Sequence, residues 1–316
     1  MPAPSSARNR ILIAFACVYF FWGSTYGGIR IAGEHLPPPL VGAIRTLLST
    51  LILAGLCVAR GISLRVSRAV AWRLAVVGIL FMSINNVLLV WAEEKVPSGY
   101  ASIVIAMIPI MVAIAENLLP GGETLTLHGW VGTILGAIGM CILVWPRLHS
   151  AAGLDRQGLE GFFILVVAAV AFAAGSILSR RFNFQVDTFA ATAWQLGCAS
   201  ILNFTVALIA GNFHTALWTT RGVLAVAYLA VFGSVVGLTA YVYLLKHVPV
   251  TKVSTYAFVN PVVAVFLGFV LFGERLVPAE VGGMLLILIA VATVILSRTR
   301  RTVPPTNPML EQPIEE

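Results

Sequence analysis

The amino-acid sequence predicts an all-α membrane protein with ten transmembrane helices, arranged as two inverted five-helix repeats. Three observations predict this fold: an apolar composition, ten long apolar segments, and a sequence pattern that recurs at a fixed spacing. Of the 316 residues, 59% are hydrophobic and only 10% are charged, and the mean hydropathy is +0.94. Soluble domains are about one quarter charged. Most of the surface of this protein is therefore expected to face lipid.

The apolar segments are long enough to cross a bilayer, whose hydrocarbon core of about 30 Å requires roughly 20 helical residues. They are continuous rather than alternating, which excludes a membrane β-barrel. The first segment follows Arg8 and Arg10 as a signal peptide would, but its length and the lack of a small-residue cleavage site favour a retained helix. In chain order, the predicted helices cover residues 11–31, 40–59, 72–91, 98–119, 127–144, 159–179, 188–210, 222–244, 251–272 and 280–297.

The basic residues orient these helices, because cytoplasmic loops carry an excess of Lys and Arg. With the N-terminus inside, most of the 20 basic residues fall on the cytoplasmic side. They are Arg8, Arg10, Arg60, Arg65, Arg68, Arg73, Arg180, Arg181, Lys246, Lys252, Arg298, Arg300 and Arg301. We therefore expect residues 1–10 to be a cytoplasmic N-terminus and residues 298–316 a disordered cytoplasmic tail. The net charge of +7 then reflects a membrane surface rather than a nucleic-acid partner.

A pattern in the first half recurs 152 residues later. Val96-Pro97 and Pro109 correspond to Val248-Pro249 and Pro261, and Gly23-Ser24 corresponds to Gly175-Ser176. The predicted repeats cover residues 11–145 and 159–297, joined by a linker at 146–158. Because each repeat has five helices, the second must enter the membrane in the opposite direction, which makes the repeat an inverted one.

The residues within these repeats resemble a known family. The similarity lies in Trp22-Gly23-Ser24-Thr25-Tyr26, the region of Arg45, Val96-Pro97-Ser98-Gly99, the run from Tyr256 to Ala264, and Gly273-Glu274-Arg275-Leu276. On these motifs the chain resembles the EamA type of the drug/metabolite transporter superfamily, over about Ile11 to Leu296. The resemblance implies ten helices around a central cavity, and export of metabolites such as amino acids, amines or related amphipathic compounds. The first-half loop Pro120–Thr124 departs from the pattern, because it has an extra residue and no Arg after Glu123.

Two prolines mark a place for a site. Pro109 and Pro261 fall near the middle of the fourth and ninth predicted helices, where a proline removes a backbone donor and produces a kink. Matched interruptions in two repeats indicate a midplane binding site, although a packing kink without ligand contact is the alternative. Tyr256 and Asn260 lie one turn apart beside the second kink. Both are candidates for lining a cavity between the first, third, fourth, sixth, eighth and ninth helices.

Polar residues inside apolar helices are further candidates for binding a substrate. Trp22, Ser24 and Tyr26 lie in the first helix, and Asn85 and Asn86 lie in the third. An amide exposed to lipid is costly, so at least one Asn should face the interior of the bundle. Hydrogen bonding between helices, without any ligand, is the alternative role.

Two charged residues lie inside predicted helices, Arg45 in the second and Glu116 in the fourth. Intramembrane charges cost several kcal/mol unless they are paired or hydrated. Each side chain could extend to the nearer membrane surface. Alternatively, Glu116 binds a proton or a cationic substrate, and Arg45 binds an anionic group.

These features predict a secondary transporter of small molecules in the inner membrane of a bacterium, with both termini in the cytoplasm. A passive channel or a structural membrane protein is the alternative. An intramembrane enzyme is disfavoured, since no catalytic pair or metal motif is found within the spans. No cofactor or metal is expected, and the four cysteines lie apart in apolar runs. Expected partners are a small-molecule substrate, the bilayer and a coupling proton. The sequence leaves the substrate, the direction of transport and the oligomeric state open.

Overall fold

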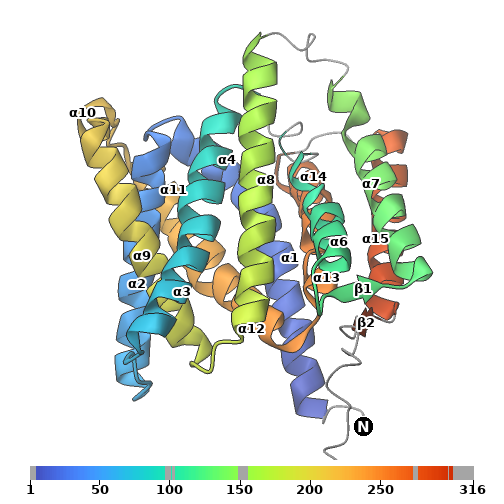
Figure 1. Ribbon diagram of the computed structural model, residues 1–316. Helices are drawn as coiled ribbons and strands as arrows, with labels where there is room; N and C mark the ends of the chain where they lie inside the picture. Colours follow the sequence, from blue (N-terminus) through green and yellow to red (C-terminus); the bar gives the residue numbers. More distant parts are fainter. Residues whose placement is uncertain are drawn as a thin grey trace, which may run out of the picture.

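The structure is a computed structural model that describes residues 5–96, 101, 104–148, 156–272, 277–297 and 299–301. It is a bundle of helices (Figure 1). The first repeat comprises α1 (Ser5–Gly33), α2 (Pro38–Ala59), α3 (Arg68–Gly78), η1 (Ile79–Asn85), α4 (Asn86–Glu93), α6 (Ile108–Leu118), β1 (Glu123–Leu125) and α7 (Leu127–Leu148).

The second repeat has its main helices in the same order, with the strand after its last helix instead of before it. It comprises α8 (Arg156–Phe182), α9 (Thr188–Ile209), α10 (Asn212–Thr215), α11 (Thr220–Tyr228), η2 (Leu229–Leu238), α12 (Thr239–His247), α13 (Val250–Val253), α14 (Tyr256–Phe272), α15 (Pro278–Leu296) and the strand β2 (Thr299–Arg301). Within the described residues, nine continuous helices are long and apolar enough to cross a membrane, and α6 is a shorter apolar helix.

The basic segments share one end of the bundle. Helix α1 begins at the bottom of Figure 1, where α2 connects to α3 and where α8 and α12 end. We call this the N-terminal end. The first helix starts at Ser5 rather than at residue 11, so part of the predicted N-terminal segment is helical. The motifs Pro97–Gly99 and Gly273–Leu276 lie outside the described residues.

Helix packing follows the internal repeat. Helix α1 of the first repeat packs on α14 of the second. Reciprocally, α8, the counterpart of α1, packs on α6, the counterpart of α14. Likewise α1 and α2 contact η2, while α8 and α9 contact η1. The most extensive pairings, α7 with α15 and α2 with α9, each join a helix to its own counterpart. Such reciprocal pairing is what a twofold relation between inverted repeats produces.

Both repeats interrupt their third helix with a π-helical segment at matching positions. Shifted by 152 residues, η1 covers positions 231–237, which fall within η2. A π-helical turn leaves backbone carbonyls without their usual partner, and such turns are frequent at functional sites. Side chains from neighbouring helices satisfy several of these carbonyls. Ser49 donates to Ala230 O at 3.0 Å, and Asn203 donates to Met82 O at 3.2 Å.

One feature corrects the prediction of a disordered tail. Residues 299–301 form β2, which pairs antiparallel with β1 so that Glu123 lies opposite Arg301. The rest of the tail lies outside the described residues. This small sheet joins the C-terminal segment to the loop where the first repeat departs from the family pattern. Apart from these two strands, the described residues are almost entirely helical or in connecting turns, so the predicted all-α class is confirmed.

Candidate functional site

A small cavity lies at the interface of the two repeats. The six helices expected to surround such a cavity do so, and α2 adds one residue. The lining residues are Trp22, Thr25, Tyr26 and Ile29 of α1, Arg45 of α2, Phe81, Met82 and Asn85 of η1, Asn86 and Leu89 of α4, Ile105 and Ile108 at the start of α6, Phe172 of α8, Leu238 of η2, and Tyr256 and Asn260 of α14. Most of the polar residues predicted from the sequence therefore meet in one place.

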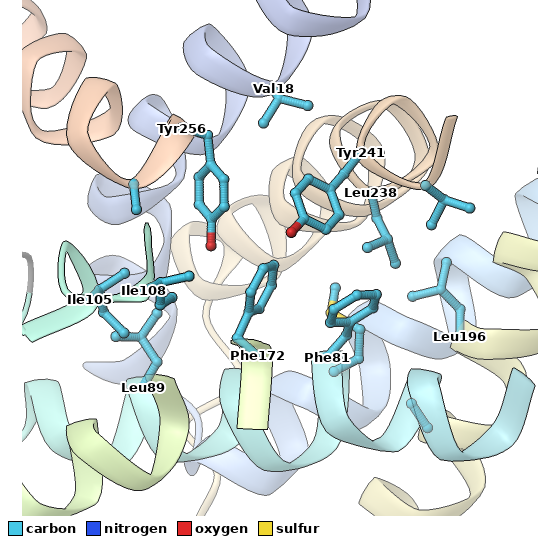
Figure 2. Close-up of a cluster of buried hydrophobic side chains, with 14 of the residues drawn as sticks. Val18, Phe81, Leu89, Ile105, Ile108, Phe172, Leu196, Leu238, Tyr241 and Tyr256 are labelled. Carbon is cyan, nitrogen blue, oxygen red and sulfur yellow. The ribbon is translucent and has the colours of Figure 1, made fainter. Parts of the chain in front are cut away.

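Aromatic rings form one wall of the cavity. The Trp22 ring lies 4.8 Å from that of Tyr256 and 4.9 Å from that of Tyr241, measured between centroids. Phe172 lies 4.8 Å from Phe81 and 5.6 Å from Tyr256. Figure 2 shows the rings of the two tyrosines and the two phenylalanines directed toward one another. Edge-to-face and tilted rings at these distances attract one another, so the wall is a cohesive apolar surface.

The polar residues of α1 have different surroundings. Trp22 lines the cavity and donates its indole N–H to Gly233 O at 2.9 Å, which satisfies a carbonyl of η2. Ser24 points away from the cavity and bonds the hydroxyl of Tyr228 at 2.5 Å. Its counterpart Ser176 bonds the hydroxyl of Tyr241 at 2.7 Å. Ser24 therefore holds α1 against α11, and it is not part of the cavity wall.

The asparagines combine structural bonds with unpaired acceptors. Asn85 donates to Ala168 O at 3.0 Å, which joins η1 to α8. The side-chain oxygens of Asn86 and Asn260 are buried and lack a hydrogen-bond partner among the described residues. A buried acceptor left unpaired costs about 1–3 kcal/mol. Both residues line the cavity, where a donor group of a bound molecule could pair with them.

Arg45 brings an uncompensated positive charge to the cavity. The residue is 3% exposed, and its Nε donates to Ser234 Oγ of η2 at 2.8 Å. One terminal nitrogen has no hydrogen-bond partner, and no salt bridge is formed with an acidic residue of the described chain. The guanidinium therefore does not extend to a membrane surface. It is held at the cavity with part of its hydrogen-bonding capacity unused.

The two prolines lie beside breaks in their helices. Pro261 is inside α14, as predicted, whereas Pro109 is in the first turn of α6 instead of at the middle of a long helix. Tight turns precede both: Met107 N donates to Val104 O, and Phe258 N donates to Thr255 O. Ile108 and Asn260, each directly before a proline, line the cavity.

Glu116 lies away from the cavity, in an ion cluster at the N-terminal end of the bundle. Its carboxylate accepts from Glu123 N at 2.8 Å and lies 3.8 Å from Arg181 Nε. Glu123 in turn forms an ion pair with Arg180 at 3.1 Å. This geometry joins α6 and β1 to the end of α8. It gives Glu116 a structural surrounding that the sequence did not reveal, because the loop after α6 folds back onto it.

Neutralising Glu116 should therefore weaken the fold rather than the binding of a solute. In Glu116→Gln, the amide loses the charge that faces Arg181, and we expect a loss of about 1–2 kcal/mol with unchanged affinity for solutes. Thermal denaturation in detergent and solute binding would measure the two effects. Glu160→Gln, which breaks an exposed ion pair with Lys95, should change neither. Intact stability with altered affinity would instead place Glu116 on the transport path.

Sequence reasoning missed the apolar part of the cavity. Phe81, Phe172 and Leu238 line it, and Tyr241 supports it, but apolar residues inside apolar helices carry no distinguishing signal. Ser234, the partner of Arg45, was also missed. The repeat held one signal for the Tyr241 side of the cavity. Ser176 is the counterpart of Ser24, and in the structure it bonds the hydroxyl of Tyr241.

Comparison with known proteins gives a consistent result. The EamA-like transporter family matches residues 9–145 and 159–296, one match for each half. The chain is 34% identical over 286 residues to the uncharacterized inner membrane transporter YedA of Escherichia coli strain K12, covering 90% of each chain. It is 24% identical to the uncharacterized transporter YvbV of Bacillus subtilis strain 168, covering 91% of each.

A solved crystal structure shares the fold. It superimposes with a TM-score of 0.77 at 21% identity and covers 92% of this chain and 97% of its own. At this identity the likeness concerns the fold alone. The family matches, in contrast, cover both halves and include the helices that surround the cavity. This protein is a multi-pass membrane protein that belongs to the EamA-like transporter family.

Proposed function

We propose that this protein is a secondary transporter that exports small organic metabolites across the inner membrane of a bacterium. The observation that carries the proposal is the cavity between the repeats, where Arg45 presents an unpaired nitrogen and Asn86 and Asn260 present unpaired oxygens. Ligand sites typically combine an apolar wall with a few polar groups that fix orientation. Here the aromatic wall is suited to an apolar body, and the polar atoms are suited to charged or hydrogen-bonding groups.

The positive charge of Arg45 narrows the substrate class. Guanidinium groups bind carboxylates with strong, directional hydrogen bonds. The unpaired oxygens of Asn86 and Asn260 accept hydrogen bonds, for example from an ammonium or amide N–H. A compound that carries a carboxylate, a donor group and an apolar body matches all three features. Among the compounds implied by the family resemblance, amino acids fit this arrangement better than simple amines.

Alternating access would move such a compound across the membrane. The inverted repeats can exchange conformations around the cavity, so that it opens first to one side and then to the other. The π-helical segments and the breaks beside Pro109 and Pro261 border the cavity, and interrupted helices can bend with less loss of hydrogen bonds than continuous ones. The basic N-terminal end of the bundle supports a cytoplasmic location of both termini.

Counterflow in proteoliposomes tests this proposal. Vesicles holding purified protein are loaded with one unlabelled solute from a panel of amino acids, amines, purines and sugars, and uptake of the same labelled solute is followed. We expect transient accumulation of labelled amino acids above the external concentration. If no solute of the panel is transported, the proposed function is wrong. Single-channel currents across planar bilayers without counterflow would indicate a channel instead.

A further inference from the structure

A second acidic residue lies at the opposite end of the bundle from Glu116. Glu93 is the last residue of α4. Both of its carboxylate oxygens are buried and have no hydrogen-bond partner among the described residues. The residue lines a pocket together with Ile29, Arg30, Gly33, Glu34, Val90 and Glu94. This pocket lies beside the ends of α1 and α4, which pack against each other.

Nearby cations do not neutralise Glu93. Arg30 forms an ion pair with Glu34 at 3.6 Å, and Lys95 forms one with Glu160 at 3.2 Å. The end of α4 adds the partial negative charge of a helix C-terminus. Other ionisable groups toward this end of the bundle include Tyr26 of α1, His35 after α1, Glu94 after α4 and Arg156 at the start of α8. An ionised carboxylate that is buried without a partner is costly, and a bound proton removes that cost.

The pocket of Glu93 adjoins the central cavity. Ile29 lines both spaces, and Tyr26, one turn before Arg30 on α1, lines the central cavity. On the facing helix, Asn86 and Leu89 line the cavity, whereas Val90 and Glu93 line the outer pocket. Residues three and four apart share a helix face. Facing stripes of α1 and α4 therefore lead from the substrate cavity to the buried carboxyl group.

We propose that Glu93 binds a proton from the side of the membrane opposite the N-terminus, and that protonation stabilises the packed arrangement of α1 and α4, so that the pH on that side controls how readily this end of the bundle opens. When this end opens to water, the carboxylate becomes hydrated and releases its proton. When α1 and α4 pack together as in the structure, the neutral acid is the form that fits. Closure then takes up one proton and opening releases one, as linkage requires. The inference rests on the proposed function and adds to it a step of the transport cycle that is controlled by a proton.

The proton site can be tested without knowledge of the substrate. Infrared difference spectra of the purified protein in nanodiscs, recorded between alkaline and acidic buffers, report the C=O stretch of protonated carboxyl groups. We expect a carboxyl band that Glu93→Gln removes and that Glu94→Gln, a change at the neighbouring residue, leaves in place. Loss of the band on adding Na⁺ at fixed pH would show that Glu93 takes a metal cation, which overturns the proposal.

Transport provides the second readout. With any solute found by counterflow, Glu93→Gln should still catalyse counterflow, but the rate should no longer respond to the pH on the side of the membrane opposite the N-terminus. Glu94→Gln should keep that response. A pH response that persists in Glu93→Gln, or a carboxyl band unchanged by this substitution, would overturn the inference. If no solute is transported while the band behaves as expected, the proposed function fails and the proton site stands.

Discussion

Arg45→Met is expected to abolish transport of carboxylate-bearing solutes while leaving the protein folded. Arg45 is buried beside the cavity, and it forms no ion pair within the described chain. Truncating one partner of a buried, hydrogen-bonded charge pair costs about 2–5 kcal/mol. Since 1.4 kcal/mol is a factor of ten, counterflow of such solutes should fall by about 30-fold or more. Methionine keeps most of the volume of the side chain.

The stability of Arg45→Met is expected to stay equal or to rise, although its transport falls. An uncompensated buried charge destabilises a fold, and its replacement by an apolar side chain of similar volume is often neutral or stabilising. We therefore expect the melting temperature of Arg45→Met to equal or exceed that of the unchanged protein. Ser234→Ala removes only the partner of Nε and should reduce transport less. Carboxylate transport that survives Arg45→Met would show that the guanidinium does not bind the substrate.

Most of the fold could be predicted from the sequence, because the determinants of membrane helices are local. Apolar length gave the spans, and the recurrence of Val96-Pro97 and Gly23-Ser24 gave the repeat. The π-helical segments could not be predicted, since one extra residue per turn changes hydrogen bonding without changing hydrophobicity. The pairing of β1 with β2 was also beyond the sequence, because it joins residues 123–125 to residues 299–301 through contacts that are not local.

The site was only partly predictable: its polar residues could be identified in the sequence, and its apolar residues could not. Trp22, Asn86 and Asn260 stand out in apolar helices because burying a polar group requires a partner. Glu116 stands out for the same reason, yet its partners lie in a loop and at the end of α8. Sequence alone does not distinguish a polar group that meets a cavity from one that meets another part of the chain.

Gly23 shows how the cavity depends on close helix packing. A Cβ atom at this position would lie 2.6 Å from Val263 Cβ and 3.0 Å from Asn260 O, both on α14. Those atoms are at or next to the backbone, so they cannot move without shifting the helix. Trp22, the preceding residue, and Asn260 both line the cavity. The seam between α1 and α14 therefore sets the distance between two walls of the site.

Gly23→Val is consequently expected to destabilise the protein and to abolish transport. Overpacking of a filled interior typically costs about 1–3 kcal/mol, and a valine exceeds a single added methyl group. Gly27→Val is the matched control, because the same change on the same helix meets no atom within 4 Å at the Cβ position. Any loss of helix propensity is common to both variants. The difference between the two variants, in melting temperature and in counterflow rate, therefore measures the effect of close packing between α1 and α14.

The two glycines also separate packing from substrate binding. If Gly23→Val lowers the melting temperature but keeps the counterflow rate of Gly27→Val, the α1–α14 seam supports the fold without setting the geometry of the cavity. If both rates fall together, the effect belongs to α1 as a whole and the packing argument is wrong. A selective loss in Gly23→Val would mean that the cavity requires α1 and α14 at the separation that only glycine permits.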